Sequence, residues 1–152
     1  MKKNLAKIIG YFVITALVVF ILDRILKEFV VAYLINDITI IEGFARLTYS
    51  ENTGVAFGLQ LPFLVQLILV PALIIGGFYL VLKHLKIERL SVLLLTGAIA
   101  GAATSNYADR LIHGFVIDYI SIWIWPIFNL ADVIITLGIF TIFIFYGKIN
   151  RV

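Results

Sequence analysis

Two aspartates, Asp118 and Asp132, stand in a largely apolar stretch of the chain and could together hydrolyse a peptide bond. Each lies in a short polar motif beside an apolar run, Gly-Phe-Val-Ile-Asp-Tyr at 114–119 and Phe-Asn-Leu-Ala-Asp at 128–132. A carboxylate in or beside a bilayer is unfavourable unless it is paired or hydrated, so such acids are functional candidates. Neighbouring carboxylates share one proton, which supplies a general acid and a general base together.

The alternative for each aspartate is an isolated interfacial acid that is hydrated or caps a helix. Asp132 follows Pro126 and Asn129 at the expected start of a helix, where the helix dipole stabilises a carboxylate. Asp118 lies on the extended segment before it, which can fold back over that helix end. The two acids would then share one site, with Asp132 as the ionised member and no metal or cofactor required.

Other reactive residue types form no evident catalytic set. His84 and His113 are expected on opposite membrane faces, so they cannot share a metal ion. No serine has a histidine or lysine in an evident general-base arrangement, and the absence of cysteine excludes thiol catalysis and disulfides. An oxygen-ligated metal at the aspartates is the alternative that the residues leave open.

The composition predicts an integral membrane protein. The 152 residues are 62% hydrophobic and 14% charged, with a mean hydropathy of +1.10, far more apolar than a soluble domain. Four windows have about the 20 apolar residues needed to cross a bilayer: 8–34, 63–82, 90–111 and 128–146. We expect a single domain over 1–152, because no linker divides the chain.

Charge asymmetry predicts the orientation in the membrane. Most of the 12 basic residues lie at the two termini and between the second and third spans, where only Glu88 of the 9 acids is found. By the positive-inside rule that side is cytoplasmic, so the chemistry is expected on the extracytoplasmic side. The first span resembles a signal peptide, but it is too long and lacks a cleavage motif, so we expect an anchor. The net charge of +3 forms no basic stripe, which argues against nucleic acid.

The extracytoplasmic face is expected to carry a small β element. Residues 38–49 are rich in β-branched and aromatic side chains and predict one or two short strands, closed by a turn at 52–54. Residues 115–125 alternate, with Asp118 on one face and Tyr119 on the other. The predicted fold class is an all-α membrane protein of four transmembrane helices with a small sheet resting on the outer leaflet.

Several polar residues have both structural and functional interpretations. Asp23 and Lys27 are four residues apart on one helical face and can form an ion pair that fixes the first span. Asn52 and Asn129 could hold a peptide backbone, although asparagines in turns and caps need no substrate.

The third span carries two further pairs of residues. Asp109 and Arg110 are expected to tie it to the sheet, and Gly97 and Gly101 to permit close helix packing.

Five motifs, taken in order, resemble those of the lipoprotein signal peptidase (signal peptidase II) family, and the match covers nearly the whole chain. They are Asp23-Arg24-Ile25-Leu26-Lys27, Asn52-Thr53-Gly54-Val55-Ala56-Phe57, Asn106-Tyr107-Ala108-Asp109-Arg110, Val116-Ile117-Asp118-Tyr119 and Phe128-Asn129-Leu130-Ala131-Asp132.

The resemblance implies an intramembrane aspartic endopeptidase that removes signal peptides from diacylglyceryl-modified bacterial prolipoproteins, cutting before the lipidated cysteine. It implies Asp118 and Asp132 as the catalytic dyad, without metal or cofactor. The residues implied in site support or substrate contact are Asp23, Lys27, Asn52, Gly54, Asn106, Arg110, Asn129 and Ala131.

The family resemblance also implies a location and partners. The protein would be a four-helix bundle in the bacterial inner membrane, with an extracytoplasmic β-cradle and a short surface helix. Membrane lipid and globomycin-type inhibitors are the other implied partners. We expect a monomer, because one chain contains the whole proposed site.

Two residues depart from the family pattern. Arg24 stands where the family usually has glutamine, and Ser105 stands where a glycine precedes Asn106. They bear on substrate preference and inhibitor affinity more than on reaction type. The rival interpretation is a non-catalytic four-span lipid- or peptide-binding homologue, or a small proton-coupled transporter, although no inverted repeat favours the transporter.

Overall fold

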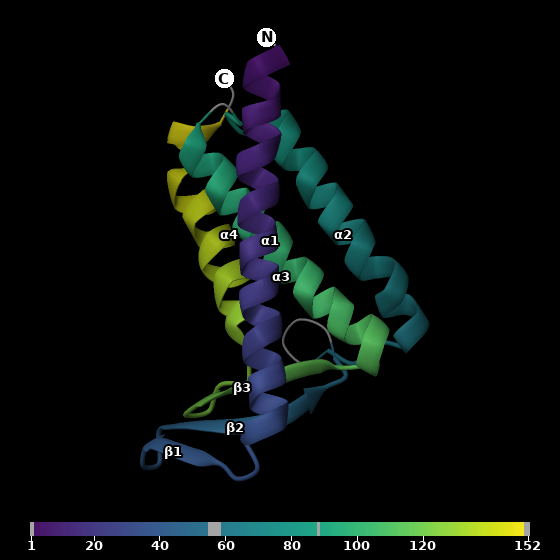
Figure 1. Cartoon of the computed structure of the whole chain (residues 1–152), viewed down its shortest axis with the longest axis vertical. Helices are drawn as coiled ribbons and strands as arrows, with labels where there is room; N and C mark the ends of the chain where they lie inside the picture. Colours follow the sequence, from purple (N-terminus) through teal and green to yellow (C-terminus); the bar gives the residue numbers. More distant parts are fainter. Residues whose placement is uncertain (1, 55–58, 88, 151–152) are drawn as a thin grey trace.

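The computed structural model describes residues 2–54, 59–87 and 89–150. Figure 1 shows the helices running along a common direction, with the sheet at one end and the start of α1 and the end of α4 at the other. The elements are α1 (Lys2–Tyr33), β1 (Ile38–Ile41), β2 (Ala45–Asn52), α2 (Phe63–His84), α3 (Leu90–His113), β3 (Val116–Ile122) and α4 (Leu130–Ile149). The predicted fold class, four long helices with a small sheet, is confirmed.

Each helix contains a stretch that is long and apolar enough to cross a membrane: Lys7–Tyr33, Phe63–Val81, Leu90–His113 and Leu130–Ile149. The stretch in α3 has the lowest mean hydropathy, 1.2, and the largest share of buried residues, 44% of its most apolar window. The stretches in α1, α2 and α4 have mean hydropathies of 2.1 to 2.4 and are at most 11% buried. Five polar residues of α3 lie inside the bundle, while the other helices present apolar side chains to lipid. These are Thr96, Ser105, Asn106, Asp109 and Arg110.

Two glycines of α3 allow α1 to approach closely. A Cβ atom on Gly97 would lie 2.7 Å from the carbonyl oxygen of Phe12, and one on Gly101 would collide with the backbone of Ala16. Small residues let helix backbones come together in this way. The prediction that Gly97 and Gly101 permit close helix packing is confirmed.

The three strands form an antiparallel sheet in the order β1-β2-β3. In the register of β2 and β3, Ser50 lies opposite Asp118, and the pairing shifts between Leu47 and Ser50. Such an irregularity bends a strand and redirects its side chains. The predicted turn at 52–54 is present, because the Gly54 N–H donates to Asn52 Oδ1 at 2.9 Å.

The alternation predicted for 115–125 is only partly found. All four residues from Val116 to Tyr119 are buried, because β3 is paired with β2 and packed against α1 and α3. The strand ends at Ile122, and Trp123 turns the chain with a φ of 47°. The last helix begins at Leu130, two residues beyond the expected 128, because Phe128 forms a bridge with Ile120. Among the described residues there is no short surface helix.

Candidate active site

Asn129 holds both Asp118 and Asp132. Its Nδ2 donates to Asp118 Oδ1 at 2.7 Å, and its Oδ1 accepts the Asp132 N–H at 2.9 Å. The Asn129 N–H donates to Asp132 Oδ2 at 3.3 Å, which completes a capping box at the start of α4. The fold thus brings together the two aspartates that the sequence singled out, one from β3 and one from α4.

A second amide flanks each aspartate. Asn52, at the end of β2, donates from Nδ2 to Asp118 Oδ2 at 2.8 Å, and Asn106 of α3 donates from Nδ2 to Asp132 Oδ1 at 2.8 Å. Both oxygens of each carboxyl group therefore accept a hydrogen bond from an asparagine. The Asn52 and Asn129 amides, which we considered as contacts for a peptide backbone, bind the aspartates in this structure.

Asp118 is 1% exposed, and its protonation reflects this burial. Burial and, second, the charge of Asp132 raise the pKa of Asp118 to about 7, against the hydrogen bonds from Asn52 and Asn129 and the charge of Lys27. A carboxyl group with such a pKa still holds a proton near neutral pH, which is the requirement for a general acid.

A cluster of buried charged side chains lies next to Asp118 and Asp132 and joins α1 to α3. The Lys27 Nζ lies 2.7 Å from Asp23 Oδ2 and 2.8 Å from Asp109 Oδ2, and it donates to Asn106 Oδ1 at 2.7 Å. The side chains of Asp23, Lys27 and Asp109 are fully buried. Such charges are tolerated because each has an opposite partner and further hydrogen bonds.

Asp23 also reaches the start of α4. Its Oδ1 accepts the Ala131 N–H at 3.0 Å, and the preceding N–H, of Leu130, donates to the Tyr119 hydroxyl at 3.2 Å. Free N–H groups at a helix start need such partners. The first turn of α4, and with it Asp132, is therefore fixed by side chains from α1 and β3.

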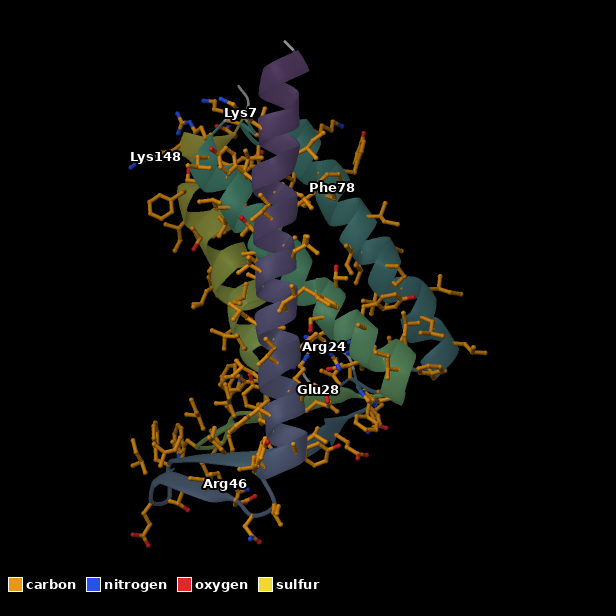
Figure 2. The ribbon with its side chains drawn as sticks, in the orientation of Figure 1. Lys7, Arg24, Glu28, Arg46, Phe78 and Lys148 are labelled. Carbon is orange, nitrogen blue, oxygen red and sulfur yellow. The ribbon has the colours of Figure 1, made fainter. Side chains whose placement is uncertain are left out.

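The two residues that depart from the resembled motifs, Arg24 and Ser105, both belong to this cluster. Ser105 Oγ donates to Asp23 Oδ2 at 2.7 Å. Arg24 pairs with Asp109 and, at the exposed edge, with Glu28 at 2.9 Å. Figure 2 shows Arg24 and Glu28 on the half of α1 nearer the sheet. In the described part of the chain, neither departure forms a hydrogen bond with Asp118 or Asp132.

Arg110 connects α3 with the segment after β2. Its Nη2 donates to the Gly54 carbonyl at 2.8 Å, its Nη1 to the Asn106 carbonyl at 3.1 Å, and its Nε to Gln66 Oε1 at 3.1 Å. Asp109 accepts the Ile117 N–H of β3 at 3.2 Å. The pair therefore ties α3 to the sheet and the segment after it, as expected. Residues 55–57 of the second motif lie outside the described residues.

Gln66 is the residue at this site that the sequence reasoning missed. Its Nε2 donates to the carbonyls of Thr53 and Leu61, and its side chain is buried. The signal was a lone amide in the apolar window 63–82, where a polar side chain needs a partner. The window was interpreted only as a membrane span.

The two histidines do not join the site. His84 closes α2 and His113 closes α3, and the ends of these helices lie at opposite ends of the bundle (Figure 1). Within residues 2–54, 59–87 and 89–150, no three histidine or acidic side chains gather as a metal-binding group.

The chain is similar to known proteins over most of its length. The sequence profile described as Signal peptidase (SPase) II matches residues 15–147. The lipoprotein signal peptidase of Chlorobium phaeobacteroides (strain BS1) is 32% identical, over 90% of this chain and 96% of that protein. The lipoprotein signal peptidase of Syntrophomonas wolfei is 43% identical, over 80% of this chain and 83% of that protein.

Two solved structures share the fold. Both are described as bacterial membrane enzymes determined by the in meso method. One has a TM-score of 0.79 and 27% identity, covering 92% of this chain and 89% of that chain. The other has a TM-score of 0.76 and 26% identity, covering 90% of this chain and 92% of that chain.

Proposed function

The chain belongs to the signal peptidase II family of membrane proteases, and from this premise we propose an aspartic mechanism carried by Asp118 and Asp132. The substrates proposed are diacylglyceryl-modified bacterial prolipoproteins, cut just before the lipidated cysteine. The observation that carries the mechanism is that Asn129 donates to both carboxyl groups at one end of the bundle, from its side chain to Asp118 and from its backbone N–H to Asp132.

In the proposed reaction, Asp132 is the general base and Asp118 the general acid. The Asp132 carboxylate takes a proton from water as the water oxygen attacks the scissile carbonyl carbon. Asp118 gives its proton to the carbonyl oxygen, which yields a tetrahedral diol. The proton that Asp132 took from water then passes to the amide nitrogen and the C–N bond breaks. The amine leaves while the diol returns one proton to Asp118 and becomes the new carboxyl group. A raised pKa of about 7 suits Asp118 to the acid role. The mechanism requires no metal or cofactor.

The supporting residues have distinct proposed roles. Asn52, Asn106 and Asn129 orient the carboxyl groups through their amides. Asp23 and Lys27 fix the first turn of α4 through the Ala131 N–H. Gly54 and Arg110 fix the backbone that follows Asn52.

The membrane placement is proposed from charge. Lys7 and Lys148 lie at the end of the bundle opposite the sheet (Figure 2), and the positive-inside rule makes that end cytoplasmic. The dyad would then face the outer leaflet of the bacterial inner membrane, where a diacylglyceryl-anchored peptide presents its cleavage point. We propose a monomer, because all site residues come from one chain. We also propose that globomycin-type peptides inhibit it, as the family resemblance implies.

The test is cleavage of a diacylglyceryl-modified prolipoprotein by the purified protein in detergent, beside Asp118→Asn and Asp132→Asn. We expect product from the wild type only, at an unchanged rate when a chelator is added. Near-normal cleavage by either variant would exclude that aspartate from the mechanism. Loss of cleavage with the chelator would replace the metal-free mechanism by a metal-dependent one.

A further inference from the structure

Gln66, near the start of the apolar helix α2, forms hydrogen bonds through both the nitrogen and the oxygen of its side-chain amide. It is 3% exposed, and both Nε2 hydrogens are donated to carbonyls, of Thr53 at 2.8 Å and of Leu61 at 2.7 Å. Its Oε1 accepts from Arg110 Nε at 3.1 Å. Thr53 and Leu61 lie at the two ends of the connection between β2 and α2, so one side chain holds both ends.

These contacts lead to one of the two aspartates. Thr53 follows Asn52, whose Nδ2 donates to Asp118 Oδ2 at 2.8 Å. Arg110, which Gln66 orients, donates to the carbonyl of Gly54 at 2.8 Å. The backbone after Asn52 is thus held at Thr53 by Gln66 and at Gly54 by Arg110. Both contacts depend on the Gln66 amide, because Gln66 also orients Arg110.

We propose that Gln66 is a positioning residue for peptide cleavage: it holds the backbone at Thr53 against Leu61 and thereby aims the Asn52 amide at Asp118. The inference rests on the proposed role of Asp118. The competing explanation is a polar anchor that only stabilises α2, and the two differ in what happens to the chemistry of Asp118.

Two substitutions separate these explanations. Gln66→Met keeps the length and removes all three hydrogen bonds without changing the charge. Gln66→Glu keeps an acceptor for Arg110, but it places a carboxylate against the carbonyls of Thr53 and Leu61. The matched control is Tyr107→Phe, because the Tyr107 hydroxyl also joins α3 to α2, at the Leu67 carbonyl at 3.2 Å. That contact does not involve the connection.

The first readout is cleavage. We expect Gln66→Met and Gln66→Glu to lower kcat/KM by about 10- to 100-fold, the size of effect that small misplacements of catalytic groups produce. Tyr107→Phe should stay within about twofold of the wild type.

The second readout is the pH profile of Gln66→Met. The charged groups around Asp118 are Asp132 on α4, Lys27 on α1 and Arg110 on α3. The Asn52 hydrogen bond lowers the pKa of Asp118, so its loss should raise that pKa and move the alkaline limb of activity to higher pH. Asn52→Ala should move the limb in the same direction. A lower amount of folded enzyme would reduce the rate without moving the limb.

The third readout does not need activity. The chain has no cysteine, so a spin label on Thr53→Cys reports on this backbone alone. We expect the label to be more mobile when Gln66 is methionine or glutamate, and unchanged when Tyr107 is phenylalanine. An unchanged label, or an active Gln66→Met enzyme with the wild-type limb, overturns the proposal. An inactive wild type counts against the proposed function instead, and the label still decides whether Gln66 holds the connection.

Discussion

Asp118 carries a carboxyl group whose protonation is linked to folding. Its pKa rises from the ordinary value of 3.8 to about 7, chiefly through burial and then through the charge of Asp132. Between these two values the folded state keeps a proton that the unfolded state has lost, so stability falls as pH rises. At one pKa unit per 1.36 kcal/mol, the loss is at most about 4 kcal/mol and is complete about one pH unit above the folded pKa.

Asp118→Asn removes this dependence. We expect the difference in thermal midpoint between the variant and the wild type, measured in detergent, to shift in favour of the variant from pH 4 to pH 7. About one pH unit above the pKa of Asp118 the difference should become constant, because the wild-type group is then ionised in both states. Replacing the carboxyl group by an amide also disturbs the hydrogen bonds from Asn52 and Asn129. That effect does not change with pH, so it does not alter the pH dependence of the difference. A difference that stays constant from pH 4 to pH 8 would show that Asp118 ionises normally in the folded protein.

At the same residue scale, the sequence predicted that the two aspartates share one site, but it gave Asn129 as a contact for a peptide backbone and not as the residue that bridges them. Spacing alone could predict the shared site because the two motifs flank a short turn. The sequence could not predict which side chain contacts which carboxylate. Asn52 reaches Asp118 only through the register of β2 and β3, and a one-residue slip would turn it to the other face.

Among the elements, the first turn of α4 combines a helix cap with the active site. The Asn129 side chain uses Oδ1 for the cap and Nδ2 for Asp118, so substitutions can separate the two roles. Asn129→Ser retains a capping oxygen and removes the donor to Asp118, whereas Asn129→Ala removes both.

We expect both Asn129 variants to lose most of their cleavage activity, and Asn129→Ala to be less stable than Asn129→Ser by about 0.5–2 kcal/mol, the contribution of the capping oxygen. Thermal unfolding and prolipoprotein cleavage, measured on the same preparations, test this pattern. Equal thermal midpoints for alanine and serine would show that the cap contributes little to folding. Full activity of Asn129→Ser would show that Asp118 does not need the Asn129 donor.

The crossing of α1 and α3 makes a prediction about glycines. A Cβ atom at Gly101 would meet the backbone of Ala16, whereas a Cβ atom at Gly77 of α2 would meet nothing within 4 Å. Gly101→Ala should therefore force the two helices apart and destabilise the protein by about 1–3 kcal/mol. Gly77→Ala is the matched control, and it should be neutral or stabilising by up to about 1 kcal/mol, because alanine favours a helix.

The thermal midpoints of these two alanine variants in one detergent give the comparison. Because the dyad is held partly by Asp23 and Lys27 of α1, Gly101→Ala should also lower cleavage activity, and Gly77→Ala should not. A stable, active Gly101→Ala enzyme would mean that the close approach of α1 and α3 is not required.

At the scale of the whole molecule, hydropathy predicted the four helices because each must cover the bilayer core with apolar side chains. The third helix was the weakest signal, and the structure explains why. It lies inside the bundle and carries Asn106, Asp109 and Arg110 on buried positions. The alternation expected for 115–125 is only partly found for a related reason. The first four residues of β3 pack beside α1 and α3 and are buried whichever face they lie on.

The orientation in the membrane provides a prediction that involves every element. Glu42 lies in the turn between β1 and β2, at the sheet end, and Lys148 lies near the end of α4, at the opposite end (Figure 2). Both are exposed, and because the chain has no cysteine, Glu42→Cys and Lys148→Cys each create a single reactive thiol. The positive-inside rule places Lys148 in the cytoplasm and Glu42 outside.

A membrane-impermeant maleimide, added to spheroplasts of cells that express each variant, should label Glu42→Cys and leave Lys148→Cys unmodified until the membrane is permeabilised. Labelling of Lys148→Cys in intact spheroplasts would show that the orientation is the opposite of the proposed one, with the dyad facing the cytoplasm. Such a result would leave the fold and the aspartate geometry unchanged. It would, however, contradict the proposed encounter with prolipoproteins at the outer leaflet, because the cleavage point and the two carboxyl groups would lie on opposite sides of the bilayer.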